Sequence, residues 1–133
     1  MQLVRTAARL MLAWLFVHAG LDVLRNPAPR AAVAAPVIRA AREMVPGLPA
    51  DDVTMVRLNA AAQLIAGGLL ALGKWPMFAA FGLAVSLVPT TIGGHRFWEE
   101  SDPARRMQHR THFYKNLAIV GGLLFAALES QPR

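Results

Sequence analysis

Four stretches of the chain contain no charged residue, and charged segments separate them. These stretches are Leu10–Leu21, Leu58–Gly73, Trp75–Gly94 and Asn116–Leu128. An α-helix rises about 1.5 Å per residue, so about 20 apolar residues are needed to cross a bilayer. The third stretch has this length, and basic side chains at the ends of the others can extend toward the head groups. The pattern therefore predicts one all-α domain over residues 1–133, an up-down four-helix transmembrane bundle. Its spans are expected at about residues 5–24, 54–73, 75–94 and 112–129.

The long loop between the first two spans contains its own helical pattern. It opens on an Asn-Pro turn and closes on Pro46, Gly47 and Pro49. Between these breaks, apolar residues can share one side of a short helix over Arg30–Met44, which includes Pro36. We expect this helix to lie in the membrane interface. Asp51 is placed to cap the second span.

Composition separates a membrane protein from a soluble one. Apolar residues make up 55% of the chain and charged residues 17%, whereas charged residues reach about 25% in ordinary globular domains. A soluble bundle helix would need a polar face around half its circumference, and the apolar stretches show none. The first stretch also resembles a signal peptide, but it lacks a clean small-x-small cleavage site. The absence of cysteine excludes disulfides, iron–sulfur clusters and thiol nucleophiles.

The distribution of basic residues predicts the orientation in the membrane. Ten lysines and arginines fall in or beside loops one and three, and four, including Arg133, fall on the terminal side. Positive charge is retained in the cytoplasm, so we expect loops one and three there, in a multi-pass protein of the inner or plasma membrane. The net charge of +6 then reflects orientation and attraction to anionic lipids. No basic helix or aromatic-basic pattern indicates a nucleic-acid partner.

Reading each span at a spacing of four residues reveals a face of polar or small residues. The four faces are Trp14, His18, Asp22; Asn59, Gln63, Gly67, Ala71; Gly82, Ser86, Thr90, Gly94; and Ala118, Gly122, Ala126. In lipid, small residues allow close helix approach and polar residues bond between helices, so these faces are expected to meet. Packing alone is an equally good interpretation of the small residues.

An up-down bundle brings the polar positions to one side of the membrane. The candidate ligand-binding residues are His18, Asp22, Asn59, Gln63, Ser86, Thr90, His95, Lys115 and Asn116. Ionisable residues inside spans usually pair or serve a function. We expect Asp22 to pair with Lys115 or His95. For His18, a packing role and a functional role as a proton relay or quinone-carbonyl donor remain alternatives.

A metal site is the weaker interpretation of the third loop. His109 and His112 are spaced to share a helix face near His95, and acidic residues follow His95. The spacing matches no strong zinc signature, and the loop's arginines are natural partners for its acids. We therefore predict neither a metal site nor a catalytic residue, and no autonomous catalysis.

The placement of polar residues within and between the apolar stretches resembles that of the DoxX family of small bacterial membrane proteins. The similar segments are ARLMLAWLFVHAGLDVLRNP in the first span, QLIAGGLLALG at Gln63–Gly73, HRFW at His95–Trp98 and FYKNLAIVGGLL at Phe113–Leu124. The resemblance covers nearly the whole chain. It implies a four-helix membrane bundle associated with quinol oxidase, thiosulfate-related or oxidative-stress oxidoreductase systems.

The resemblance also implies a function, beside which two other hypotheses remain open. It implies a redox-associated membrane subunit whose polar pocket binds a quinone or a lipid head group, with a protein partner or a second copy in the membrane. Many family members carry Glu where this chain has Gln63, and a neutral amide cannot titrate. The competing hypotheses are a structural or assembly protein that docks a partner through its basic loops, and a small transporter.

Overall fold

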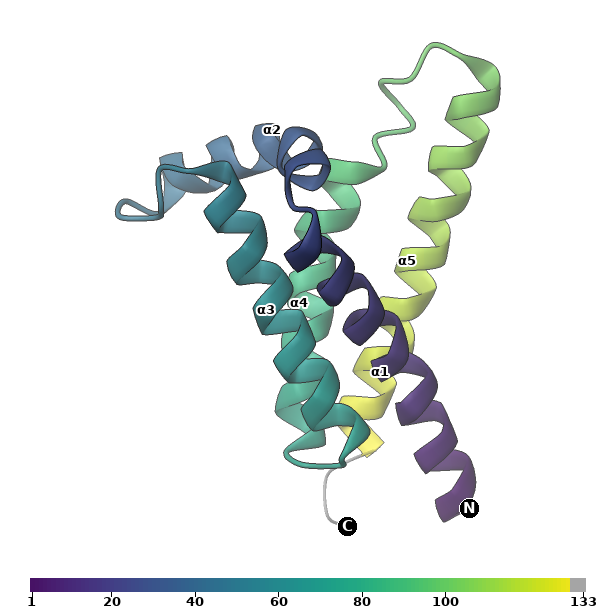
Figure 1. Ribbon diagram of the computed structural model, residues 1–133. Helices are drawn as coiled ribbons and strands as arrows, with labels where there is room; N and C mark the ends of the chain where they lie inside the picture. Colours follow the sequence, from purple (N-terminus) through teal and green to yellow (C-terminus); the bar gives the residue numbers. More distant parts are fainter. Residues whose placement is uncertain (130–133) are drawn as a thin grey trace.

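The computed structural model describes residues 1–129, which form five helices and no strand. The helices are α1 (Gln2–Arg25), α2 (Ala28–Met44), α3 (Asp52–Ala71), α4 (Pro76–Gly94) and α5 (Pro103–Glu129). Figure 1 shows α1, α3, α4 and α5 side by side, alternating in direction, while α2 lies across one end. The predicted all-α class is confirmed. Arg133, counted in the orientation argument, lies outside the described residues.

Local sequence signals set most of the helix boundaries. The Asn26-Pro27 pair separates α1 from α2, because a proline ring clashes with a preceding helical turn. Asp51 caps α3 as predicted, accepting hydrogen bonds from the backbone N–H groups of Val53 and Thr54. α4 begins at Pro76, a position where the missing N–H of proline removes no helical hydrogen bond. The loop-one helix begins at Ala28, slightly earlier than expected, and continues through Pro36.

Three of the described helices are long and apolar enough to cross a membrane: α1, α3 and α4. Their outward surfaces carry large apolar side chains, such as Met11 and Phe78, which are 76% and 70% exposed. Apolar surface of this extent is stable in lipid and unstable in water. The protein is therefore embedded in a lipid bilayer.

The fourth expected span, residues 112–129, belongs to the longer helix α5 and is not among these three. The length of α5 is sufficient, because it has 27 residues. The reason is therefore its composition. His112, Lys115 and Asn116 fall within the expected span and lower its mean hydropathy. The predicted count of four spans thus depends on how α5 accommodates these polar residues.

α1 and α3 pack closely against each other at two positions where one of the helices has a glycine. A Cβ atom on Gly20 would lie 2.9 Å from the carbonyl oxygen of Ala60, and one on Gly67 would lie 3.1 Å from Val17. Gly67 therefore packs as the small-residue pattern predicted. Gly82 does not, since a Cβ there would meet nothing within 4 Å.

The prediction that the polar face of α1 turns toward the other helices is wrong. Trp14 is 68% exposed, and the side chains of His18 and Asp22 are also exposed. The face that α1 buries instead carries Ala13, Phe16 and Gly20. Small residues there let the two backbones approach, so close packing decides the rotation of α1.

Candidate ligand-binding pocket

Three predicted polar residues form a hydrogen-bonded chain between α3 and α4. The side-chain amide of Gln63 donates to Ser86 Oγ at 2.9 Å, and Ser86 Oγ donates to Asn59 Oδ1 at 2.8 Å. Gln63 is buried. The Ser86 hydroxyl has a single O–H donor, and it uses that donor on Asn59 while accepting from Gln63, so this chain orients both amides.

A second polar contact joins α4 to α5. The amide of Asn116 donates to Thr91 Oγ1 at 3.1 Å, and Thr91 Oγ1 donates to the backbone carbonyl of Leu87 at 2.8 Å. Both side chains are buried. Thr90, and not Thr91, is among the site residues that the sequence predicts. Thr90 lies on the four-residue repeat, whereas Thr91 is the member of the pair that faces α5.

Both contacts border one cavity of about 350 Å³, at the end of the bundle that α2 covers. Six of the nine predicted site residues line it: Asn59, Gln63, Thr90, His95, Lys115 and Asn116. Ser86 holds two of them in place through its hydrogen bonds. Ligand pockets commonly occupy about 300–1,000 Å³ and place a few polar groups among apolar ones. The other lining residues are mostly apolar and come from α1, α2, α3 and α4.

Helix α2 forms a wall of this cavity that the sequence analysis did not anticipate. Val33, Val37 and Ile38 line the cavity from α2, and Arg30 adds a cation. α2 lies close to the end of α4, since a Cβ on Gly93 would lie 2.8 Å from Val37 Cγ2. Its other end is held by Arg42, which binds Asp52 at 2.7 Å and donates to the Pro49 carbonyl at 2.8 Å. The signal available in the sequence was the apolar side of the loop-one helix.

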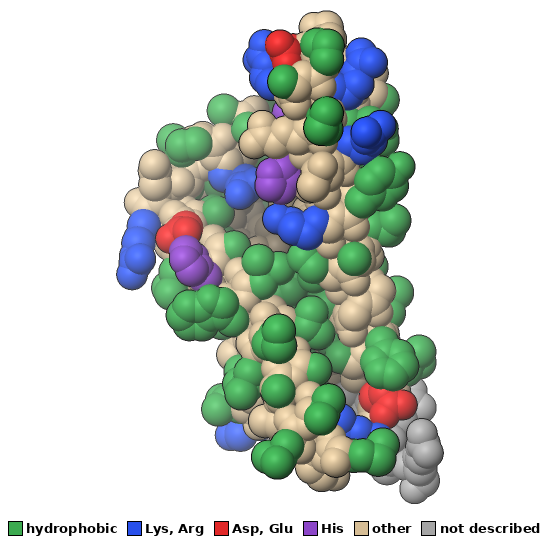
Figure 2. Space-filling view, turned by 90° about the vertical axis from the view of Figure 1, so that its right-hand side faces the viewer, with side chains coloured by type: hydrophobic (Ala, Val, Ile, Leu, Met, Phe, Trp, Pro, Cys, Tyr) green, Lys and Arg blue, Asp and Glu red, His purple; other side chains and the backbone are tan. Residues whose placement is uncertain are grey.

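Positive charge and imidazole groups gather at the margin of the cavity. Figure 2 shows a hollow on this side of the molecule with Lys or Arg and His side chains around it. His95 lies next to two more histidines: its Nδ1 is 3.5 Å from His109 Nδ1, and its ring stacks on that of His112 at 5.1 Å. Lys115 Nζ is 3.3 Å from His112 Nδ1. Within residues 1–129, no group of three or more His, Asp or Glu side chains is arranged to hold a metal ion.

The environment of His95 favours its neutral form. Burial lowers the pKa of His95 to about 4, and the nearby cations and imidazoles of His112, His109, Arg30 and Lys115 add to this shift. His95 is therefore uncharged at pH 7 and can both donate and accept a hydrogen bond.

This shift predicts a pH dependence of stability. The unfolded chain binds a proton on His95 near pH 6.5 and the folded protein near pH 4, so stability should fall as pH is lowered through that interval. Imidazole NMR of the protein in nanodiscs should show a His95 midpoint near pH 4. A His95→Gln variant should lose this part of the pH dependence of unfolding. A midpoint for His95 near 6.5 would contradict the arrangement.

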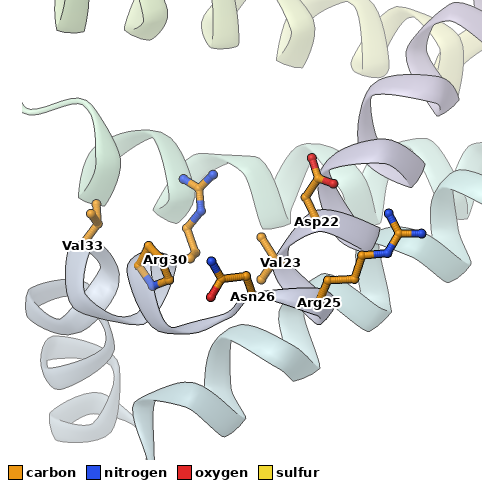
Figure 3. A pocket seen from close by; sticks show the side chains of 7 residues that line it. Asp22, Val23, Arg25, Asn26, Arg30 and Val33 are labelled. Carbon is orange, nitrogen blue, oxygen red and sulfur yellow. The ribbon is translucent and has the colours of Figure 1, made fainter.

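His18 and Asp22 lie outside the cavity. His18 Nδ1 is 3.1 Å from Asp22 Oδ2, one turn away on α1, so the partner of Asp22 is His18 and not Lys115 or His95. Asp22 lines a second, open depression of about 510 Å³ at the corner between α1 and α2, which shares Val23, Arg30 and Val33 with the cavity. In Figure 3 the side chains of Asp22 and Arg30 extend to the same side of this corner. The rotation of α1 that buries Gly20 accounts for the outward position of His18 and Asp22.

The family model for DoxX matches residues 4–96 of the chain. The chain belongs to the DoxX family. No curated protein and no solved structure matches it.

The DoxX match begins in the first turn of α1, covers α2, α3 and α4, and ends two residues after α4. Within the matched range lie Asn59, Gln63, Ser86, Thr90 and His95, whereas Lys115 and Asn116 come from α5, beyond it. The cavity of this DoxX protein thus joins positions inside the matched range to polar residues outside it.

Proposed function

We propose that this DoxX protein is a multi-pass protein of the cell membrane in which α5 crosses as a fourth span. α5 packs along α4 and contacts α1, which closes a ring of four helices. Asn116 is buried beside the cavity, and Lys115, which is exposed, lines the cavity close to the end of the span, where a long cationic side chain can reach the head groups. The excess of Lys and Arg in loops one and three supports a cytoplasmic location for the α2 end of the bundle, in the inner membrane.

The pocket at that end binds the polar head of a membrane-soluble molecule, a quinone or a lipid head group. The observation that carries this proposal is the 350 Å³ cavity, in which oriented amides stand opposite an apolar wall. A ligand with a polar head and an apolar body satisfies both surfaces at once. His18 and Asp22 lie outside the cavity, at the α1 corner, and this proposal gives them no contact with the ligand.

Membership of the DoxX family supports a role as an accessory subunit of a respiratory or oxidative-stress system, without autonomous catalysis. In such a system the protein would hold the ligand for a partner that carries the redox centre, and without cysteine this chain has no thiolate to bind an iron–sulfur cluster itself. Binding and presentation, not bond-breaking, is the chemistry that the amide network supports.

Mass spectrometry of the full chain purified in lipid nanodiscs tests this function. We expect a quinone or a specific lipid to co-purify, and added decylubiquinone or phosphatidylglycerol to raise the unfolding temperature. Finding a stoichiometric protein partner and no retained small molecule would overturn the binding role.

Replacing Gln63 provides the matched test. Gln63→Leu removes the donor to Ser86 and one polar group of the cavity, and should weaken binding of the co-purified molecule about tenfold, equivalent to about 1.4 kcal/mol. Gln108→Leu makes the same change at an exposed position of α5 and should leave binding unchanged. Equal affinities in the two variants would contradict the assignment of Gln63 to the site.

One observation favours assembly as a second candidate function. Figure 1 shows that the beginning of α5 extends beyond the ends of the neighbouring helices. This segment carries Arg105, Arg106 and Arg110, all exposed. An exposed basic extension suits an acidic protein partner. Replacing the three arginines by glutamine should release such a partner and leave the retention of small molecules intact.

A further inference from the structure

Two basic side chains, Arg30 and Lys115, line the cavity, and no Asp or Glu among the described residues lines it. Arg30 also lines the neighbouring depression that contains Asp22, but no ion pair joins these two side chains. Elsewhere in residues 1–129, several arginines have carboxylate partners: Arg5 binds Glu129, Arg42 binds Asp52 and Arg96 binds Glu99. The structure gives neither Arg30 nor Lys115 such a partner within the described residues.

The two cations come from different helices and line the same cavity. Arg30 lies at the start of α2, with its Nη1 4.0 Å from the position that a Cβ on Gly94 would take at the end of α4. Lys115 comes from α5, beside His112. His95, at the end of α4, is close enough for both cations to lower its pKa. Arg30, His95 and Lys115 therefore surround one end of the cavity.

A cluster of this kind is costly in a membrane unless a counter-charge is present. A lysine or arginine is most costly at the centre of a span and less so near the interface. Two cations that line one cavity without a carboxylate beside them suit an anion, because arginine and lysine form strong hydrogen bonds to carboxylate and phosphate oxygens. The neutral amides of Asn59 and Asn116 border the same space and add further donors.

The rest of the cavity lining indicates which kind of group the remainder of the ligand contains. Val33, Val37 and Ile38 on α2 face Leu15 and Phe16 on α1, so the cavity is apolar away from the cations. Figure 2 shows the hollow on the side face of the molecule rather than on its end. A ligand dissolved in the bilayer can reach such an opening with its chain still in lipid.

We propose that the cavity binds a membrane lipid with an acidic head, whose phosphate or carboxylate lies between Arg30 and Lys115 and whose chain follows the apolar wall of α2. This inference rests on the proposed function, which assigns a head-group ligand to the same cavity, and it selects anionic lipids over neutral quinones and zwitterionic lipids. The phosphate of phosphatidylglycerol and the carboxylate of a fatty acid share the required chemistry.

Native mass spectrometry of the full chain in detergent separates these ligands. The probes are dioleoylphosphatidylglycerol, oleate, dioleoylphosphatidylcholine, decylubiquinone and inorganic phosphate. We expect phosphatidylglycerol or oleate to bind at least about tenfold more tightly than phosphatidylcholine and decylubiquinone, and the stronger of the two identifies the acid. Inorganic phosphate should bind weakly, because it cannot use the apolar wall.

A charge-matched pair of variants makes the test specific. Arg30→Gln with Lys115→Gln should reduce binding of the acidic lipid by about tenfold to a hundredfold. Arg39→Gln with Arg57→Gln removes the same charge from exposed positions outside the lining and should leave it unchanged. Equal losses in both pairs would show that general attraction, not the cavity, binds the lipid. The folded state of each variant is checked by its unfolding temperature in the absence of added lipid.

The outcomes distinguish this inference from the proposed function. If phosphatidylcholine or decylubiquinone binds as tightly as the acidic lipids and Gln63→Leu weakens that binding, the acidic-head inference fails and the head-group pocket stands. If inorganic phosphate binds as tightly as phosphatidylglycerol, the site is one for a free anion and the lipid assignment fails. If no probe binds, both fail.

Discussion

Replacement of Gly20 by valine is expected to lower the free energy of unfolding by about 1–3 kcal/mol, the usual cost of forcing extra atoms into a packed interface. A Cβ on this residue would lie 2.9 Å from the carbonyl oxygen of Ala60 and 3.4 Å from Leu64. The nearest obstacle is backbone, which cannot rotate away. α1 would have to move from α3, and the contacts around Phe16 would be lost with it.

Gly82→Val is the control for this experiment, because the same change on α4 meets open space. Unfolding of both variants in mixed micelles by added SDS gives the comparison. If Gly20→Val unfolds like the wild type, or if Gly82→Val is equally destabilised, close α1–α3 packing is not what fixes the rotation of α1.

Replacement of Gly93 by alanine should disturb the cavity more than the bundle. The added Cβ would lie 2.8 Å from Val37 Cγ2, and valine has few alternative side-chain rotamers in a helix. We expect α2 to shift away from α4 and binding of the co-purified ligand to fall about tenfold. The unfolding temperature should change less, because the four packed helices remain.

A compensating change makes this prediction specific. Val37→Ala removes the atom that collides, so the double variant Gly93→Ala with Val37→Ala should recover binding relative to Gly93→Ala alone. The coupling between the two substitutions is measured by a double-mutant cycle in a ligand-binding titration. Additive effects would mean that the α2–α4 contact does not shape the cavity.

The helices could be predicted where the sequence contains explicit stop and start residues. Asn26-Pro27, Asp51 and Pro76 mark boundaries that the structure reproduces closely. The start of α5 could not be predicted from hydropathy, which treats residues 103–111 as a charged loop. Pro103 begins the helix, Asp102 accepts the N–H of Arg105 at 2.9 Å, and arginine and alanine are good helix formers.

The site could be predicted in part for a similar reason. Up-down topology alone brings together polar residues at the matching ends of spans, which is how Asn59, Thr90 and Asn116 were chosen. It cannot predict how far each helix rotates about its axis. The glycine contacts of Gly20 decide that for α1, and they turn His18 and Asp22 outward. Arg30 was missed because it belongs to α2, whose position depends on tertiary contacts with α3 and α4.

The residues of α2 that line the cavity are not part of the main hydrophobic core of the bundle. The main hydrophobic cluster is formed by residues of α1, α3, α4 and α5, and it contains no residue of α2. A second, small cluster joins Ala31 and Ile38 of α2 to Val56 of α3. Substitutions on the cavity side of α2 can therefore reshape the pocket without disturbing the main core, so loop one is the part of the chain in which ligand preference can diverge while the membrane scaffold stays the same.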